Sequence, residues 1–164
     1  MDTFCEQLVR ISKGPKFYLG VTGIWLVAIV ISFFSFKIPF LAAFIIVGVG
    51  YGAYYLCGYL SVEYEYIITN GTFDVDIIYA KRNRKRIFSF ELSDVESIEK
   101  LGGATIDKKR YKNAVIACDG GEDAYKLIVS GDTGTSLVVI APNEKTRTEI
   151  VKFVPKFVGN TAFK

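Results

Sequence analysis

One long apolar stretch dominates the hydrophobic pattern of this chain. Between residues 17 and 62 the only charged side chain is that of Lys37. A helical run of about 20 apolar residues matches the hydrocarbon thickness of a bilayer, and this stretch holds two such runs, Phe17–Phe36 and Phe40–Leu60. Lipid offers no hydrogen-bond partner to a free backbone N–H or C=O, so each run has to be helical throughout. The pattern therefore predicts a transmembrane helical hairpin over residues 17–61, with a turn at residues 37–39.

A short amphipathic segment, residues 1–16, precedes the hairpin. Phe4, Leu8 and Ile11 stand at positions i, i+4 and i+7, which is the spacing of one face of a helix. Two interpretations stay open for it: an interfacial helix that lies under the lipid headgroups, or a frayed cytoplasmic tail.

After residue 62 the pattern changes to the period of two that is typical of β-strands. Two alternating segments, residues 62–69 and 72–79, flank Asn70-Gly71, the strongest short signal for a hairpin turn. Pairing across that turn sets Ile68 opposite Phe73 and places the apolar side chains of both strands on one face. The sequence therefore predicts a β-hairpin with one buried face.

The opposite face of this hairpin is acidic. Pairing sets Glu65 opposite Asp76, and two like charges there lower stability unless a basic side chain from a neighbouring strand lies between them. A metal site formed by Glu65, Asp74 and Asp76 is one interpretation, and a solvated strand face is the favoured one.

Short strands and one helix complete the chain. Five further strands are predicted at residues 86–92, 95–101, 113–118, 124–129 and 136–141. Asn143 is a plausible N-cap for a C-terminal helix that Pro155 ends near Val154. Residues 62–164 therefore form one α+β domain, a seven-stranded antiparallel, partly closed barrel with a C-terminal helix over one opening.

Several segments of this chain resemble a known class of domain. They are Tyr66–Gly71, Leu92–Ile98, Met1–Phe4, Glu63–Tyr66 and Pro142–Lys145. The order of elements resembles a pleckstrin-homology-like (PH-like) barrel, and the whole chain is similar to a family of small bacterial membrane proteins of unknown function. The resemblance implies a fold and a membrane setting but no activity. The long basic loop that binds inositol phosphates in eukaryotic relatives is replaced here by Asn70-Gly71.

Basic residues gather in the loops that a meander of strands returns to the membrane. The first such loops, around residues 80–86 and 102–112, contain nine Lys and Arg residues and a single acid, Asp107. They are Lys81, Arg82, Arg84, Lys85, Arg86, Lys108, Lys109, Arg110 and Lys112. Each nearby anionic headgroup contact contributes about 1 kcal/mol. We hypothesise that these residues dock the domain on anionic lipid; the alternative is that they only set topology or solvate loops.

The distribution of positive charge also predicts the orientation. Three of the twenty Lys and Arg residues precede the first span, one lies in the turn and sixteen follow the second span. Flanks rich in Lys and Arg stay in the cytoplasm, so we expect a multi-pass protein of the cell membrane with both termini cytoplasmic. A cleaved signal peptide fits poorly, because a second apolar span follows at once.

The spans themselves favour an anchor. Gly48 and Gly52 form a G-x-x-x-G pair, which predicts close helix packing, first within the hairpin and otherwise in a dimer. Tyrosines crowd the predicted cytoplasmic end of the second span, as an aromatic belt at the headgroups: Tyr51, Tyr54, Tyr55 and Tyr59. No ionisable side chain lies within either span, which argues against a transporter or a proton relay.

The remaining motifs point away from catalysis. The chain has no histidine and no phosphate-binding loop, so no catalytic, cofactor or metal residues are expected. Asp132-Thr133-Gly134 matches the aspartic-protease triplet, but a single copy favours a turn between strands. The basic stretch after residue 80 lacks interleaved aromatics, so nucleic acid is not expected as a partner. We therefore predict a non-enzymatic module that binds lipid or scaffolds a protein partner; the alternative is a component of a membrane enzyme or transport complex.

Overall fold

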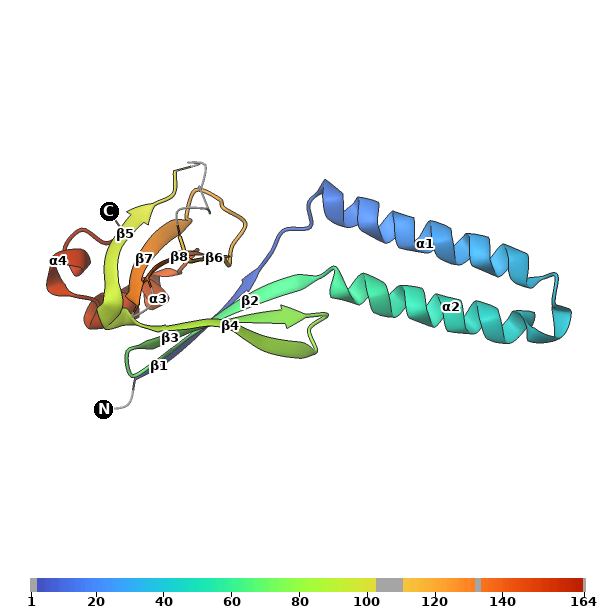
Figure 1. Ribbon diagram of the computed structural model, residues 1–164, viewed down its shortest axis with the longest axis horizontal. Helices are drawn as coiled ribbons and strands as arrows, with labels where there is room; N and C mark the ends of the chain where they lie inside the picture. Colours follow the sequence, from blue (N-terminus) through green and yellow to red (C-terminus); the bar gives the residue numbers. More distant parts are fainter. Residues whose placement is uncertain (1–2, 103–110, 132–133, 164) are drawn as a thin grey trace. The chain divides into compact units, whose positions relative to one another are not determined.

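The computed structural model describes residues 3–102, 111–131 and 134–163 (Figure 1). Contacts divide the chain into two compact units. The helical unit joins Ser12–Val62 to Tyr79–Asn83, and the sheet unit joins Met1–Ile11, Glu63–Ile78 and Arg84–Lys164.

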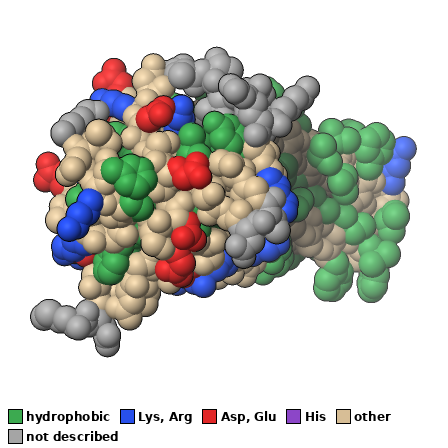
Figure 2. Space-filling view, turned by 60° about the vertical axis from the view of Figure 1, so that its left-hand side comes forward, with side chains coloured by type: hydrophobic (Ala, Val, Ile, Leu, Met, Phe, Trp, Pro, Cys, Tyr) green, Lys and Arg blue, Asp and Glu red, His purple; other side chains and the backbone are tan. Residues whose placement is uncertain are grey.

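The helical unit is an antiparallel pair of apolar helices. Helix α1 spans Pro15–Ser35 and helix α2 spans Pro39–Tyr59. Each begins with a proline, which is suited to the first helical position because its missing N–H has no partner there. At 1.5 Å per residue a 21-residue helix is about 32 Å long, so both are long and apolar enough to cross a membrane. The prediction of two apolar helices is confirmed, and hydrophobic side chains project from the part of them that Figure 2 shows.

The first sheet of the other unit has the strand order β1-β2-β3-β4. Its strands are β1 (Phe4–Arg10), β2 (Val62–Thr69), β3 (Thr72–Tyr79) and β4 (Asn83–Glu91). The helix or frayed tail predicted for the N-terminal segment is wrong, because β1 pairs antiparallel with β2 along its whole length. Phe4 and Leu8, four residues apart, share a face in a strand as well as in a helix. Strand pairing also satisfies the backbone groups at the free edge of β2, which an isolated helix would leave open.

The β2–β3 hairpin forms as the sequence predicts. Asn70 and Gly71 have φ values of 51° and 98°, so both turn residues adopt the left-handed conformation that a primed two-residue turn requires. The apolar face of the hairpin is buried: Tyr66, Ile68, Phe73 and Val75 are core residues.

The second sheet has the order β5-β7-β8-β6. A 3-10 turn, η1 (Leu92–Asp94), leads into it, and its strands are β5 (Val95–Lys100), β6 (Asn113–Ile116), β7 (Tyr125–Gly131) and β8 (Gly134–Ile140).

This arrangement corrects the predicted antiparallel barrel in three ways. The described residues contain eight strands rather than seven, because β1 adds one. They form two four-stranded sheets rather than the predicted partly closed barrel. Strand β6 runs parallel to β8. The two strands are not consecutive, because β7 lies between them in the sequence and pairs antiparallel with the other edge of β8. Residues 132–133 of the predicted Asp132-Thr133-Gly134 turn lie outside the described residues.

The C-terminal segment closes the core of the sheet unit. Helix α3 (Glu144–Phe153) starts at Asn143, whose side-chain oxygen accepts a hydrogen bond from the Thr146 N–H at 2.8 Å, so the predicted cap is confirmed. The helix ends before Pro155, as predicted, and a short helix α4 (Lys156–Gly159) follows. Ile150 and Val158 from these helices join the core formed by both sheets.

Candidate functional site

The nine predicted lipid-facing residues have different environments. Arg84 and Arg86 on β4 pair with carboxylates of the sheet unit. Lys81, Arg82 and Lys85 are exposed and form no ion pair with any described residue. Lys112 is exposed at the start of β6. The other three, Lys108, Lys109 and Arg110, lie outside the described residues.

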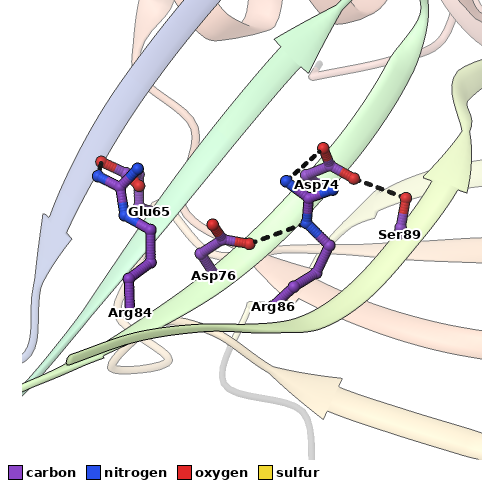
Figure 3. A network of polar contacts seen from close by, with 6 residues as sticks. All are labelled: Glu65, Asp74, Asp76, Arg84, Arg86 and Ser89. Carbon is purple, nitrogen blue, oxygen red and sulfur yellow. Dashed lines mark hydrogen bonds and ion pairs between the residues drawn. The ribbon is translucent and has the colours of Figure 1, made fainter.

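A network of charged side chains covers the outer face of the first sheet (Figure 3). Arg84 Nη2 lies 2.7 Å from Glu65 Oε1. Arg86 contacts two carboxylates, with Nη2 at 2.9 Å from Asp74 Oδ2 and Nε at 3.2 Å from Asp76 Oδ1. The arginines are about half exposed, whereas the carboxylates are nearly covered. The network therefore ties β4 to β2 and β3.

This network explains how the chain tolerates facing acids on neighbouring strands. Glu65 and Asp76 are only 2% and 4% exposed, so the expectation of a solvated strand face is wrong. The basic side chains that the sequence argument requires come from β4, whose arginines lie over both positions. Removing one partner of such a buried pair leaves a charge without compensation, which is why these arginines matter for stability.

The side-chain alternation of β4 shifts within this network. Ser89 Oγ donates to Asp74 Oδ1 at 2.6 Å, and Arg86 binds the same carboxylate. Residues three apart on a regular strand point to opposite faces. The two contacts therefore require an irregular step between Arg86 and Ser89, and that step allows both side chains to reach Asp74.

Glu65 has a perturbed acidity. Its burial raises the pKa of the carboxyl above the usual range, and the neighbouring Glu6 carboxyl on β1 adds to the rise. The charge on Arg84 lowers the pKa of Glu65, and the charge on Asp76 raises it. Burial is the largest of these effects, so this ion pair does not hold the glutamate at an ordinary pKa.

A chain of exposed polar groups lies at the end of α2. The hydroxyls of Tyr55 and Tyr59 are 2.9 Å apart, and Asn83 Nδ2 donates to the Tyr59 hydroxyl at 3.1 Å. The ring of Tyr79 lies 6.4 Å from that of Tyr59. The sequence pattern predicts the tyrosines as an aromatic belt, but it carries no signal for Asn83, which reaches them from the start of β4.

The turn between β3 and β4, residues 80–82, is held against α2 in a strained conformation. Ala80 and Lys81 have φ values of 54° and 56°, although neither is glycine. The Ala80 N–H donates to the Ser61 carbonyl at 3.1 Å, and a Cβ added at Gly58 would lie 3.3 Å from the Ala80 Cβ. The absence of a side chain at Gly58 therefore lets the turn approach the helix.

Positive charge is concentrated at one end of the helical unit. Lys13 and Lys16 precede or begin α1, and Lys81 and Arg82 lie in the turn packed on the end of α2. Because the helices are antiparallel, these four cations share one end, and Lys37 stands between the helices at the other end.

The predicted contact of Gly48 and Gly52 stays a prediction. A Cβ added at either glycine would meet no heavy atom within 4 Å. The buried apolar positions of the two helices are Ala28, Ala42 and Ala53. Gly52 and Ala53 line an open apolar groove of about 560 Å³ between the helices.

The three cysteines lie apart in the chain and differ in burial. Cys5 and Cys118 are buried, and Cys57 lies within α2. Burial raises the pKa of the Cys118 thiol, which disfavours the reactive thiolate.

Two apolar helices that are long enough to cross a membrane, and a unit of two packed sheets with C-terminal helices, define an α+β protein. A family described as "Bacterial PH-like domain (DUF6106)" matches residues 1–160, and the chain belongs to this family. The match confirms the resemblance seen in the sequence. No curated protein and no solved structure matches the chain. The family and the helices together indicate a non-enzymatic module associated with a membrane.

Proposed function

We propose that the protein is a membrane-anchored PH-like module that docks on anionic lipid through the cationic end of its helical unit. In this proposal both helices span the cell membrane and both termini are cytoplasmic. The observation that carries it is the charge asymmetry of the helical hairpin: Lys13, Lys16, Lys81 and Arg82 at one end, against Lys37 at the other. Positive charge of this kind marks the cytoplasmic end of a span.

The same residues supply the attraction to lipid. Each Lys or Arg near an anionic surface contributes about 1 kcal/mol, and the effect fades beyond a Debye length of about 8 Å at physiological salt. Arg84 and Arg86 are left out of this account, because their charges already compensate buried carboxylates. Lys81 and Arg82 are exposed and form no ion pair with a described residue, so they remain available.

Hydrogen–deuterium exchange of the full chain in nanodiscs tests the docking. We expect amides 79–85 to be more protected in discs that contain phosphatidylglycerol than in discs of phosphatidylcholine alone. High salt should remove the difference, and so should the double variant Lys81→Gln/Arg82→Gln. Lys145→Gln, an exposed lysine on α3, is the matched control and should leave the difference unchanged. Equal protection in both kinds of disc would contradict the docking.

Introduced cysteines test the orientation. Cys5 and Cys118 are buried and would report poorly, so the reporters are Lys37→Cys and Lys156→Cys in a chain whose three native cysteines are replaced. An impermeant thiol reagent applied to intact cells should label position 37 and spare position 156. Labelling of position 156 instead would reverse the orientation.

A protein partner is the second candidate, and one observation favours it. Phe4 and Leu8 on β1 are 63% and 44% exposed, on the sheet face that carries the charged network. A photo-crosslinking residue at position 8 tests this candidate in cells. A discrete crosslinked product would support a scaffold for a membrane or cytoplasmic protein, including a membrane enzyme or transport complex.

A further inference from the structure

The polar chain at the end of α2 leaves one phenolic O–H available as a donor. Asn83 donates to the Tyr59 oxygen, and one of the two phenols donates to the other. Each phenol carries a single O–H, so whichever donates, the other retains an O–H with no acceptor among the described residues. The cluster is exposed, so this O–H can donate to a group outside the chain.

The charges around this cluster specify what kind of acceptor fits. Lys81 and Arg82 lie in the turn that packs on the end of α2, and their charged groups form no ion pair with a described residue. Two cations in the adjoining turn favour an anionic acceptor over a neutral one. Phosphate oxygens meet both requirements, because they accept hydrogen bonds from neutral and charged donors alike.

The backbone of the turn supports the same assignment. A left-handed conformation is unfavourable for a residue with a Cβ, and the turn places two such residues in sequence, Ala80 and Lys81. The other end of the same strand uses Asn70-Gly71, which adopts this conformation readily. Strain of this kind persists where the surrounding structure holds it, and it concentrates at functional sites. Here the Ser61 carbonyl and the close approach of Gly58 hold it.

We propose that Tyr55, Tyr59, Asn83, Lys81 and Arg82 form a site for the phosphodiester headgroup of one anionic phospholipid. The site lies wholly within the helical unit. It rests on the proposed docking, since the lipid has to be present at that end of the helices. It differs from docking by a diffuse charge in that it binds one lipid and depends on phenolic hydroxyls.

Native mass spectrometry of the full chain, released from nanodiscs of mixed phosphatidylglycerol and phosphatidylcholine, tests the site. We expect one phosphatidylglycerol to be retained in preference to phosphatidylcholine. Tyr55→Phe/Tyr59→Phe removes both hydroxyls and keeps both rings. Its retention of phosphatidylglycerol should fall roughly 10-fold, the size expected for the loss of one hydrogen bond to a charged group. Circular dichroism of each variant verifies that it folds.

Two control variants separate the site from general effects. Tyr54→Phe removes an exposed hydroxyl from the same helix, and Lys37→Gln removes the charge at the opposite end. Both should retain the lipid as the unmodified chain does. Addition of inorganic phosphate should displace little of the lipid, and full displacement would overturn a phospholipid as the ligand.

The outcomes also separate this site from the proposed docking. If Lys81→Gln/Arg82→Gln lowers retention and Tyr55→Phe/Tyr59→Phe leaves it unchanged, the docking stands and the site is overturned. If neither double variant changes retention, and the exchange protection of amides 79–85 is the same with and without phosphatidylglycerol, both proposals fail.

Discussion

The Tyr66 hydroxyl on β2 donates to the carbonyl oxygen of Ala117, which follows β6, at 2.6 Å. The same hydroxyl accepts from the N–H of Ala141, which follows β8, at 3.1 Å. One phenol of the first sheet therefore satisfies two backbone groups where strands of the second sheet end. Burial raises the pKa of Tyr66 well above its usual range, so the neutral donor persists at physiological pH.

Tyr66→Phe should destabilise the sheet unit. The substitution keeps the ring and removes both hydrogen bonds, which leaves two backbone groups unsatisfied at a site that is 1% exposed. The expected loss is about 1–3 kcal/mol in the free energy of unfolding. Urea unfolding of the full chain in detergent, followed by circular dichroism, measures it. Tyr125→Phe is the control, because it keeps the ring that packs on Phe163 and its hydroxyl has no hydrogen bond to a described residue, so it should lose less than Tyr66→Phe.

Arg86→Gln should destabilise the first sheet. Arg86 binds Asp74 and Asp76, so its loss leaves two covered carboxylates without their cation. Because the guanidinium is about half exposed, we expect a loss of about 1–3 kcal/mol, below the range for fully buried pairs. The adjacent Lys85→Gln should be nearly neutral in the same unfolding assay. Adding Asp76→Asn to the arginine variant should recover part of the loss; a purely additive double variant would mean that this pair does not interact.

The features predicted correctly depend on residues close together in the chain. The two apolar helices can be predicted from composition alone, since no other element fits such long apolar runs. Asn70-Gly71 decides the first hairpin because those residue types tolerate the left-handed backbone of its turn. Asn143 decides the start of α3 because its side chain binds an N–H three residues later.

The features that were missed depend on neighbours far apart in the chain. Strand β1 forms because β2, about sixty residues later, offers a free edge, and no local pattern records that partner. Arg84 and Arg86 fit a basic loop when only the sequence is considered, and their carboxylates become visible only once β4 lies beside β3. The Tyr59–Asn83 contact was missed for the same reason.

Gly71→Ala should destabilise the β2–β3 hairpin more than Gly120→Ala destabilises its loop. Both glycines have positive φ, so both substitutions incur a backbone cost of about 1–2 kcal/mol. Only at Gly71 would the new Cβ meet a side chain, 3.2 Å from Phe153 Cδ1 on α3. The difference between the two losses in unfolding free energy therefore measures that contact. Phe153→Leu in the Gly71→Ala background should reduce the difference; equal losses for the two glycines would contradict the contact.

Glu65 should give the sheet unit a pH dependence of a definite sign. Burial raises the pKa of Glu65 in the folded chain, so between the ordinary value of 4.5 and the folded value the folded state binds more protons than the unfolded state. Stability from this group therefore rises as pH falls through the folded pKa, and levels off below the unfolded pKa. Glu65→Gln removes this contribution. The free energy of unfolding of the unmodified chain, measured relative to that of the variant, should therefore increase as the buffer is acidified from pH 8 to 5. Glu6→Gln, which removes the neighbouring carboxyl on β1, should shift the same change to lower pH. A difference between the unmodified chain and Glu65→Gln that stays constant with pH, or shrinks on acidification, would show that Arg84 rather than burial governs this carboxylate.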